Sequence, residues 1–111
     1  MIRLERTVLG RTLSVTAERL DDGVWAAVTG GDRSHIGAIS WAEPGGAGET
    51  KAFPGHKDQF ISRPWARRLS DYVNSRVLVT CGIHYDGATP EDIAAILAAA
   101  EELLEELLKR L

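Results

Sequence analysis

The most constraining feature of this chain is a short strand pattern that leads directly into a long helix pattern near the C-terminus. Residues 76–80 are β-branched and apolar, which predicts a strand covered on both faces. Thr89, Pro90 and Asp92 predict a sharp helix start, with threonine as N-cap and aspartate closing a capping box. Between the two lie the only cysteine and a histidine, a tyrosine and an aspartate, in residues 81–87. Because side chains at a strand end are held by the sheet yet open to ligands, we expect the functional site here.

The N-terminal part of the chain reads as a series of strands. Apolar and polar residues alternate there, and period two is typical of half-buried strands. The turns between them carry Gly10, Asp21-Asp22-Gly23 and Gly30-Gly31. The sequence therefore predicts an antiparallel meander with strands at residues 2–8, 12–20, 24–29 and 35–42.

The remaining segments predict two helices and a short edge strand. Residues 43–50 are rich in Gly and Pro and predict a loop, and residues 51–53 predict an edge strand. Apolar residues recur at helical spacing in residues 63–74, with Ser62 as N-cap, and again in residues 90–110. Together these elements predict an α+β fold in two layers, with a mostly antiparallel sheet and both helices on one face.

Composition bounds the class of protein. The 111 residues predict a single domain, residues 1–111, and 44% hydrophobic content is typical of globular proteins. No apolar run approaches the roughly 18 residues needed to span a bilayer, and the first residues have mixed charge, so we expect a cytoplasmic protein without membrane contact. The single cysteine agrees with a reducing compartment.

Charge is distributed unevenly along the chain. The net charge is −3, but residues 51–76 carry six basic side chains against two acidic ones. An acidic chain with one basic segment argues against nucleic-acid binding and favours a site for a small anion. The start of the first helix, with Arg63, offers both cations and free N–H groups to a phosphate. A solvated arginine face is the alternative interpretation.

Two further chemistries are compatible with the cysteine and histidines. Cys81 and His84 can coordinate a metal with His56 or Asp86, and Cys81 with a nearby histidine can form a nucleophilic site. Neither pattern is specific, because only one ligand pair is close in sequence and no third orienting group is evident. A buried, inert Cys81 and histidines bonded to backbone or water are the structural alternatives.

Four motifs, taken in order, resemble the small prenylated-flavin chaperones, the D-type accessory subunits of UbiD-type decarboxylases. They are His35-Ile36-Gly37-Ala38, Gly55-His56-Lys57-Asp58, Ile61-Ser62-Arg63-Pro64-Trp65-Ala66 and Cys81-Gly82-Ile83-His84-Tyr85-Asp86. The resemblance implies a non-catalytic carrier that binds prenylated FMN made by a flavin prenyltransferase and helps to load it into the apo-decarboxylase. It also implies a fold similar to proteasome-assembly chaperone subunits.

The resemblance assigns cofactor-binding residues but no catalytic or metal-binding ones. The cofactor-binding residues are His35, His56, Ser62, Arg63, Cys81 and His84. A flat, largely apolar flavin with one phosphate also needs an apolar wall and a cationic anchor. We expect Ser62 and Arg63 to be the anchor, and His56 and His84 to contact the ring edge. The expected wall consists of Ile39, Trp41, Trp65 and Ile83.

Two other functions and one assembly state complete the expectations. A small metal- or Cys/His-dependent enzyme and a protein-assembly chaperone without a cofactor are the alternative functions. The C-terminal helix carries nine aliphatic positions, a stripe too wide for one sheet contact. We therefore expect a homodimer in which Leu103, Leu107, Leu108 and Leu111 bury against a second copy.

Overall fold

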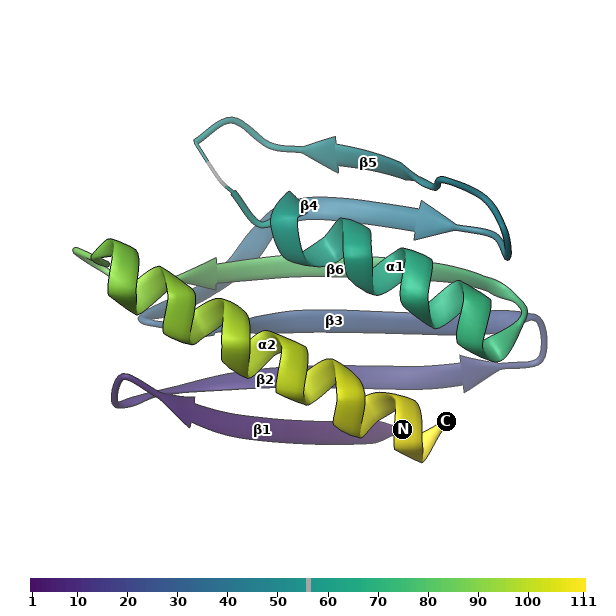
Figure 1. The fold of residues 1–111 in the computed structure, drawn as a ribbon, viewed down its shortest axis with the longest axis horizontal. Helices are drawn as coiled ribbons and strands as arrows, with labels where there is room; N and C mark the ends of the chain where they lie inside the picture. The colour runs from purple at the N-terminus through teal and green to yellow at the C-terminus, as the bar shows by residue number, and fades with distance from the viewer. Residues whose placement is uncertain (56) are drawn as a thin grey trace.

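The computed structural model describes residues 1–55 and 57–111, which form a sheet of six strands and two helices. The strands are β1 (Ile2–Val8), β2 (Arg11–Leu20), β3 (Gly23–Gly31), β4 (Arg33–Ala42), β5 (Glu49–Ala52) and β6 (Arg76–His84); the helices are α1 (Gln59–Val73) and α2 (Pro90–Arg110). Both helices lie on the same face of the sheet (Figure 1). The predicted two-layer α+β fold is therefore confirmed.

The strand order is β1-β2-β3-β6-β4-β5, so the predicted meander is correct for three strands and wrong for the fourth. Strand β6 lies between β3 and β4, parallel to β3 and antiparallel to β4. These two parallel strands direct continuous apolar rows toward the helices, and every member of each row is at most 3% exposed. Central positions in a sheet suit such rows best, which explains why β6 separates β3 from β4.

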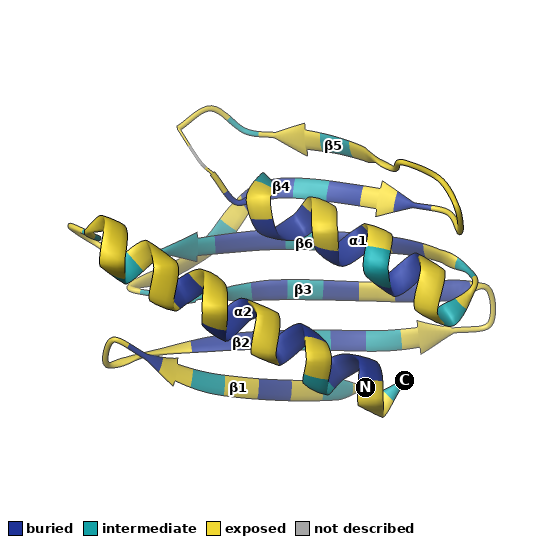
Figure 2. Ribbon diagram, in the orientation of Figure 1, coloured by how far each residue is buried: buried dark blue, intermediate teal, exposed yellow. Residues whose placement is uncertain are grey.

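The core lies between the sheet and the two helices. Helix α1 packs over β4 and β6, and α2 packs mainly over β1. Figure 2 shows buried residues on the helix sides that face the sheet and exposed residues on the outer sides. Arg68 of α1 joins the helices by pairing with Glu101 and Glu105 of α2. This arginine is one of the cations of the basic segment, and here it serves helix packing.

The two helix starts differ in how well the sequence predicts them. The predicted capping box of α2 is confirmed, since the Asp92 N–H donates to Thr89 Oγ1 at 3.1 Å and the Thr89 N–H donates to the Asp92 carboxylate at 3.0 Å. Helix α1 instead begins at Gln59 with Asp58 as N-cap, so Ser62 as N-cap was wrong. The reason is that the N–H groups of Ile61 and Ser62 already donate to the Asp58 carbonyl. Neither helix is long and apolar enough to cross a membrane.

The predicted dimer surface on α2 is wrong. Leu103 and Leu107 are fully buried within the chain, and Leu108 is 8% exposed. Leu111 packs against the same core, and its carbonyl accepts a hydrogen bond from Arg19 of β2 at 2.9 Å. The wide aliphatic stripe is used inside one molecule, so these leucines are not available to a second copy.

The sheet face opposite the helices remains uncovered. Strand β6 was predicted to be covered on both faces, and this is wrong because both helices lie on one side. Leu78 of β6 is 38% exposed, and its neighbours Trp25 of β3 and Trp41 of β4 are 38% and 42% exposed. The central strands therefore present large apolar side chains to the open side.

Candidate functional site

His35 lies where β4 deviates from regular pairing with β6. The register between these strands shifts between Ser34 and Ala38, which is a β-bulge. A Cβ atom on Gly82 of β6 would lie 1.5 Å from the His35 carbonyl oxygen. Only glycine leaves room for this backbone approach. The motif residues His35 and Gly82 are thus in contact, because the β-bulge brings the backbone of β4 close to that of β6.

Asp58 connects three elements at this end of the sheet. Its carboxylate is 5% exposed and accepts the Ile83 N–H of β6 at 2.9 Å through Oδ1. The second oxygen lies 3.2 Å from Nε2 of His35 on β4. A Cβ atom on Gly37 would lie 1.8 Å from that oxygen, so the glycine makes room for the carboxylate. Asp58 was absent from the predicted site residues, although a lone acid immediately before a helix is a recognisable signal.

Cys81 is buried beneath the site and cannot reach a ligand. Its side chain is fully buried, and its Sγ lies 3.6 Å from Asp58 Oδ1. Burial, together with the negative charge of Asp58, raises the pKa of the thiol well above its ordinary value. A protonated, enclosed thiol is a poor nucleophile and a poor metal ligand. The structure thus contradicts both the predicted cofactor contact of Cys81 and its alternative chemistries.

The Cys-x-x-His spacing lies within one strand, so it does not form a metal-binding pair. Residues three apart in a strand point to opposite faces, which separates Cys81 from His84. His84 instead has Nε2 at 2.8 Å from the Asp86 carboxylate. Among residues 1–55 and 57–111, no group of three or more His, Cys, Asp or Glu side chains is placed to hold a metal ion.

Two of the residues predicted to bind the cofactor, His35 and His84, lie close together. Their ring centroids are 6.4 Å apart, and the rings are nearly perpendicular. The His84 side chain is 33% exposed, and that of His35 is 19% exposed. The third predicted histidine, His56, lies outside the described residues. Two of the predicted site residues therefore form one cluster with Asp58.

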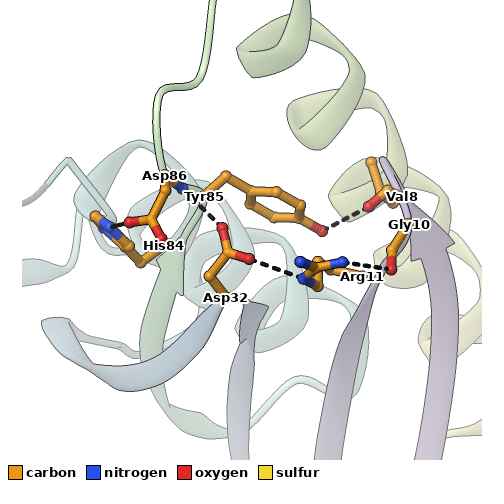
Figure 3. Close-up of polar contacts among 7 residues, drawn as sticks. All are labelled: Val8, Gly10, Arg11, Asp32, His84, Tyr85 and Asp86. Carbon is orange, nitrogen blue, oxygen red and sulfur yellow. Dashed lines mark hydrogen bonds and ion pairs between the residues drawn. The ribbon is translucent and has the colours of Figure 1, made fainter.

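A polar network holds the chain segment that carries His84 (Figure 3). Asp32 accepts the Asp86 N–H and the Arg11 side chain, each at 2.8 Å, and the hydroxyl of Tyr85 donates to the Val8 carbonyl at 3.0 Å. The hydrogen bond from the Asp86 N–H lowers the pKa of the Asp32 carboxyl most, and the hydrogen bond from Arg11 lowers it further. Burial is the main cause that raises the pKa of the Tyr85 hydroxyl, and the negative charge of Asp32 raises it further. The turn after β6 is therefore fastened to the neighbouring turns, which fixes the position of His84.

A pocket of about 240 Å³ opens beside His84. Lys57, Asp58 and His84 supply its polar groups. Its apolar wall comes from α1, β6 and the first turns of α2, through Ile61, Ile83, Ile93, Ile96 and Leu97. Since Ile93 and Leu97 are 45% and 42% exposed, the apolar wall continues onto the surface. The pocket combines a cation, an imidazole and an aliphatic surface.

The predicted phosphate anchor lies away from this pocket. Ser62 is fully buried, and its hydroxyl lies 2.7 Å from that of Ser40, so it cannot contact a ligand. Arg63 is exposed and its Nε lies 3.4 Å from the Thr50 hydroxyl of β5. Because α1 begins four residues earlier than predicted, both residues fall in its second turn rather than at its N-terminus. The cation beside the pocket is Lys57.

The predicted apolar wall is divided among three places. Trp65 is 2% exposed and belongs to the core, since it faces the sheet from α1. Ile39 and Trp41 alternate with the buried residues of β4, which places them on the open sheet face. Only Ile83 lines the pocket.

The comparisons with known proteins agree with this arrangement of motifs. Residues 7–111 match the model of the prenylated flavin chaperone LpdD-like domain. The chain belongs to this family. The resemblance inferred from the four motifs is thereby confirmed.

Individual relatives show how far the likeness extends. Protein LpdD of Lactiplantibacillus plantarum is 34% identical over 86 residues, which cover 73% of this chain and 63% of that protein. The chain thus spans less than two thirds of this relative. A chain from the crystal structure of a chaperone complex for yeast 20S proteasome assembly has a TM-score of 0.57 and 19% identity, covering 96% of this chain and 94% of that one. At that identity, the likeness concerns the fold alone.

Proposed function

We propose that this protein is a non-catalytic carrier that receives prenylated FMN from a flavin prenyltransferase and delivers it to an apo UbiD-type decarboxylase in the cytoplasm, acting as a homodimer. Membership of the prenylated flavin chaperone family supports the ligand class. The observation that carries the proposal is the pocket in which Lys57 and His84 meet an aliphatic wall. When bound in the decarboxylase, the cofactor supplies the decarboxylation chemistry there.

The residues of the pocket fit a prenylated flavin. Ile83, Ile93 and Leu97 offer an apolar surface to the ring system and its prenyl-derived part. His84 can hydrogen-bond the polar ring edge, and Lys57 provides a positive charge for the phosphate. Asp58 is a positioning residue. Its carboxylate accepts the Ile83 N–H of β6 and lies beside the His35 ring, so it holds both in place. His56 remains a predicted ring contact.

The size of the pocket suits transfer rather than retention. Its volume of about 240 Å³ is below the roughly 300–1,000 Å³ typical of sites that enclose a whole ligand. A flavin held here leaves part of its surface outside. Phe60, 64% exposed at the start of α1, lines a neighbouring hollow that shares Ile61 and Leu97 with this pocket. A partly covered cofactor remains accessible to the enzyme that receives it.

Co-expression with a flavin prenyltransferase tests the proposal. The purified protein should carry a flavin visible in its absorbance spectrum, with the mass of prenylated FMN, and should transfer it to an apo-decarboxylase. His84→Ala should lower the flavin content, whereas Lys109→Ala, at the other end of α2, should not. If the parent protein carries no flavin while the decarboxylase is loaded equally well without it, the carrier function is wrong.

A further inference from the structure

We propose that the open face of the sheet is a homodimer interface, in which two copies pack sheet against sheet around Leu78. This inference gives the homodimer of the proposed function its contact surface, and it does not depend on flavin binding. The strand register brings Trp25 of β3, Leu78 of β6 and Trp41 of β4 into one row across three adjacent strands, near the end of the sheet where β3 and β6 begin. All three side chains are more than a third exposed.

This row surrounds the largest hollow described here. Its volume is about 550 Å³, more than twice that of the pocket beside His84. Leu20 and Leu78 line it together with both tryptophans. The Trp41 indole is held in place, since its N–H donates to Glu49 at 2.9 Å. An apolar hollow with fixed aromatic walls is suited to receive side chains from another protein surface.

The strand pairing also indicates that this face is covered. Parallel pairs such as β3 and β6 normally have both faces shielded, because their strands are apolar on both sides. Helices shield only one face here (Figure 1). An antiparallel sheet that is solvated on its free side usually alternates apolar with polar residues, whereas three adjacent strands carry two tryptophans and a leucine on this free side.

The area of the face matches a homodimer. Six strands about 4.8 Å apart and about seven residues long form a surface of about 700 Å². A standard stable interface buries about 800 Å² on each partner. Face-to-face packing of two sheets is a common architecture, with a shared core about 10 Å thick. The open face therefore has about the size that a stable interface needs.

Two charges on β5 and the side-chain sizes on the neighbouring strands are self-complementary on this face. Glu49 and Lys51 lie two residues apart on β5. They face the open side, because Thr50 between them bonds Ser40, which faces the helices. A two-fold axis that crosses between them, perpendicular to the strands, places each opposite the other residue in the second copy.

The same axis crosses β3 between Trp25 and Ala27. The register ties Trp41, Leu78 and Trp25 to the level of Glu49, while Ile39, Thr80 and Ala27 share the level of Lys51. Each large side chain of the first row is then opposite a smaller one of the second row, tryptophan over alanine and leucine over threonine. Such pairing of large with small side chains fills an interface without clashes.

Sedimentation of purified variants tests the interface. The parent protein should have twice the 12.1 kDa mass of the chain at micromolar concentration. Leu78→Lys should weaken self-association about thirtyfold or more, because central interface residues dominate binding energy. Its far-UV spectrum should remain that of the parent, since the side chain is exposed in one copy. Tyr72→Lys, an equally drastic change at a 57% exposed position on α1, should leave the dimer intact.

A charge exchange tests the position of the axis. Glu49→Lys should weaken the dimer, and adding Lys51→Glu in the same chain should restore it. A monomeric parent protein, or a Leu78→Lys variant that still dimerises, would overturn the proposal. The proposal would also be overturned if the parent were a monomer that binds the decarboxylase and the Leu78→Lys variant did not bind it. The open face would then be the binding surface for that enzyme. Flavin content is measured on the same samples, so failure of the carrier function is recognised separately.

Discussion

The two hollows described above lie at different places along β6 and differ in the side chains that line them. Near Thr80 and beyond, the strand ends in the histidine site, where Asp58, His35 and His84 are tied to backbone and to each other. Near Leu78, the same strand borders a larger hollow lined by tryptophan and leucine. The smaller hollow exposes more polar surface, although Asp22, Glu43 and Arg76 also line the larger one.

This difference shows that volume alone does not identify the ligand site. A small-molecule site needs a few fixed polar groups that orient the ligand, and backbone and ion-pair contacts fix those of the histidine site. The open sheet face offers area and apolar contact, which suit a protein surface. Changes in one region should therefore alter flavin binding, and changes in the other should alter assembly.

Gly82→Ala should have the largest effect on the histidine site. The new Cβ atom would lie 1.5 Å from the His35 carbonyl oxygen, so the backbone of β4 or β6 must move. We expect a loss of about 3 kcal/mol in the free energy of unfolding, the upper end for overpacking, measured by urea denaturation. Gly46→Ala is the control, because its nearest atom lies at 3.2 Å in a surface loop. Equal stability of the two variants would refute the close approach.

Asp58→Ala should separate the two regions most clearly. It leaves the Ile83 N–H without this acceptor and removes the partner of His35, so we expect a loss of about 1–3 kcal/mol in stability and weaker flavin uptake. Asp58→Asn keeps an acceptor oxygen and should lose less. Sedimentation should show the same dimer in both variants. If assembly fails before flavin uptake does, the two regions are not independent.

Lys57→Ala should weaken flavin binding about tenfold to a hundredfold, the value of one charge-assisted hydrogen bond of roughly 1.5–3 kcal/mol. Arg63→Ala should have a smaller effect, because Arg63 points to Thr50 rather than lining the pocket. The measurement is a flavin titration at two salt concentrations, where the Lys57 variant should show the flatter salt dependence. Lys109→Ala should bind like the parent. If Arg63→Ala weakened flavin binding more than Lys57→Ala, the phosphate anchor expected from the sequence would be correct instead.

Ionisation of the Cys81 thiol should have the smallest effect on the free energy of unfolding, and only at alkaline pH. Because its pKa is raised in the folded protein, the thiol ionises first in the unfolded chain as pH rises past its ordinary value of about 8.5. Stability is therefore fully present below that pH and falls above it. Cys81→Ala should flatten this decline in urea unfolding between pH 7 and pH 10, with Tyr85 contributing the remainder. Rapid reaction of the native thiol with an alkylating reagent at pH 8 would contradict its burial.

The sequence predicted the features that depend on neighbouring residues. The hairpins at Gly10 and at Asp21-Asp22-Gly23, the alternating strands and the capping box of α2 were correct, since each is decided by side chains within a few positions. The hairpin predicted at Gly30-Gly31 was wrong, because β6 lies between β3 and β4. His35 and His84 were both named as site residues from the family resemblance, but their contact with each other was not predicted. Local chemistry offers no rule that brings residues 35 and 84 together.

The errors share one cause, which is the tertiary arrangement around β6. The strand entered the sheet between β3 and β4, which left its Leu78 face open and placed Trp41 and Ile39 there instead of beside Ile83. The N-cap of the helix that precedes it is Asp58 rather than Ser62, because the N–H groups of Ile61 and Ser62 donate to the Asp58 carbonyl. That shift withdrew Ser62 into the core and made Asp58 the junction of the site.

By itself, the sequence determined the element types, the two-layer class and the family, because periodicity, capping and motif order are written in adjacent residues. Only the tertiary structure decided which side chains meet. The β-bulge, the glycine approaches at Gly37 and Gly82, and the buried carboxylate of Asp58 join segments more than twenty residues apart. Such contacts depend on strand order and on which face the helices cover, and these follow from packing the whole apolar surface at once.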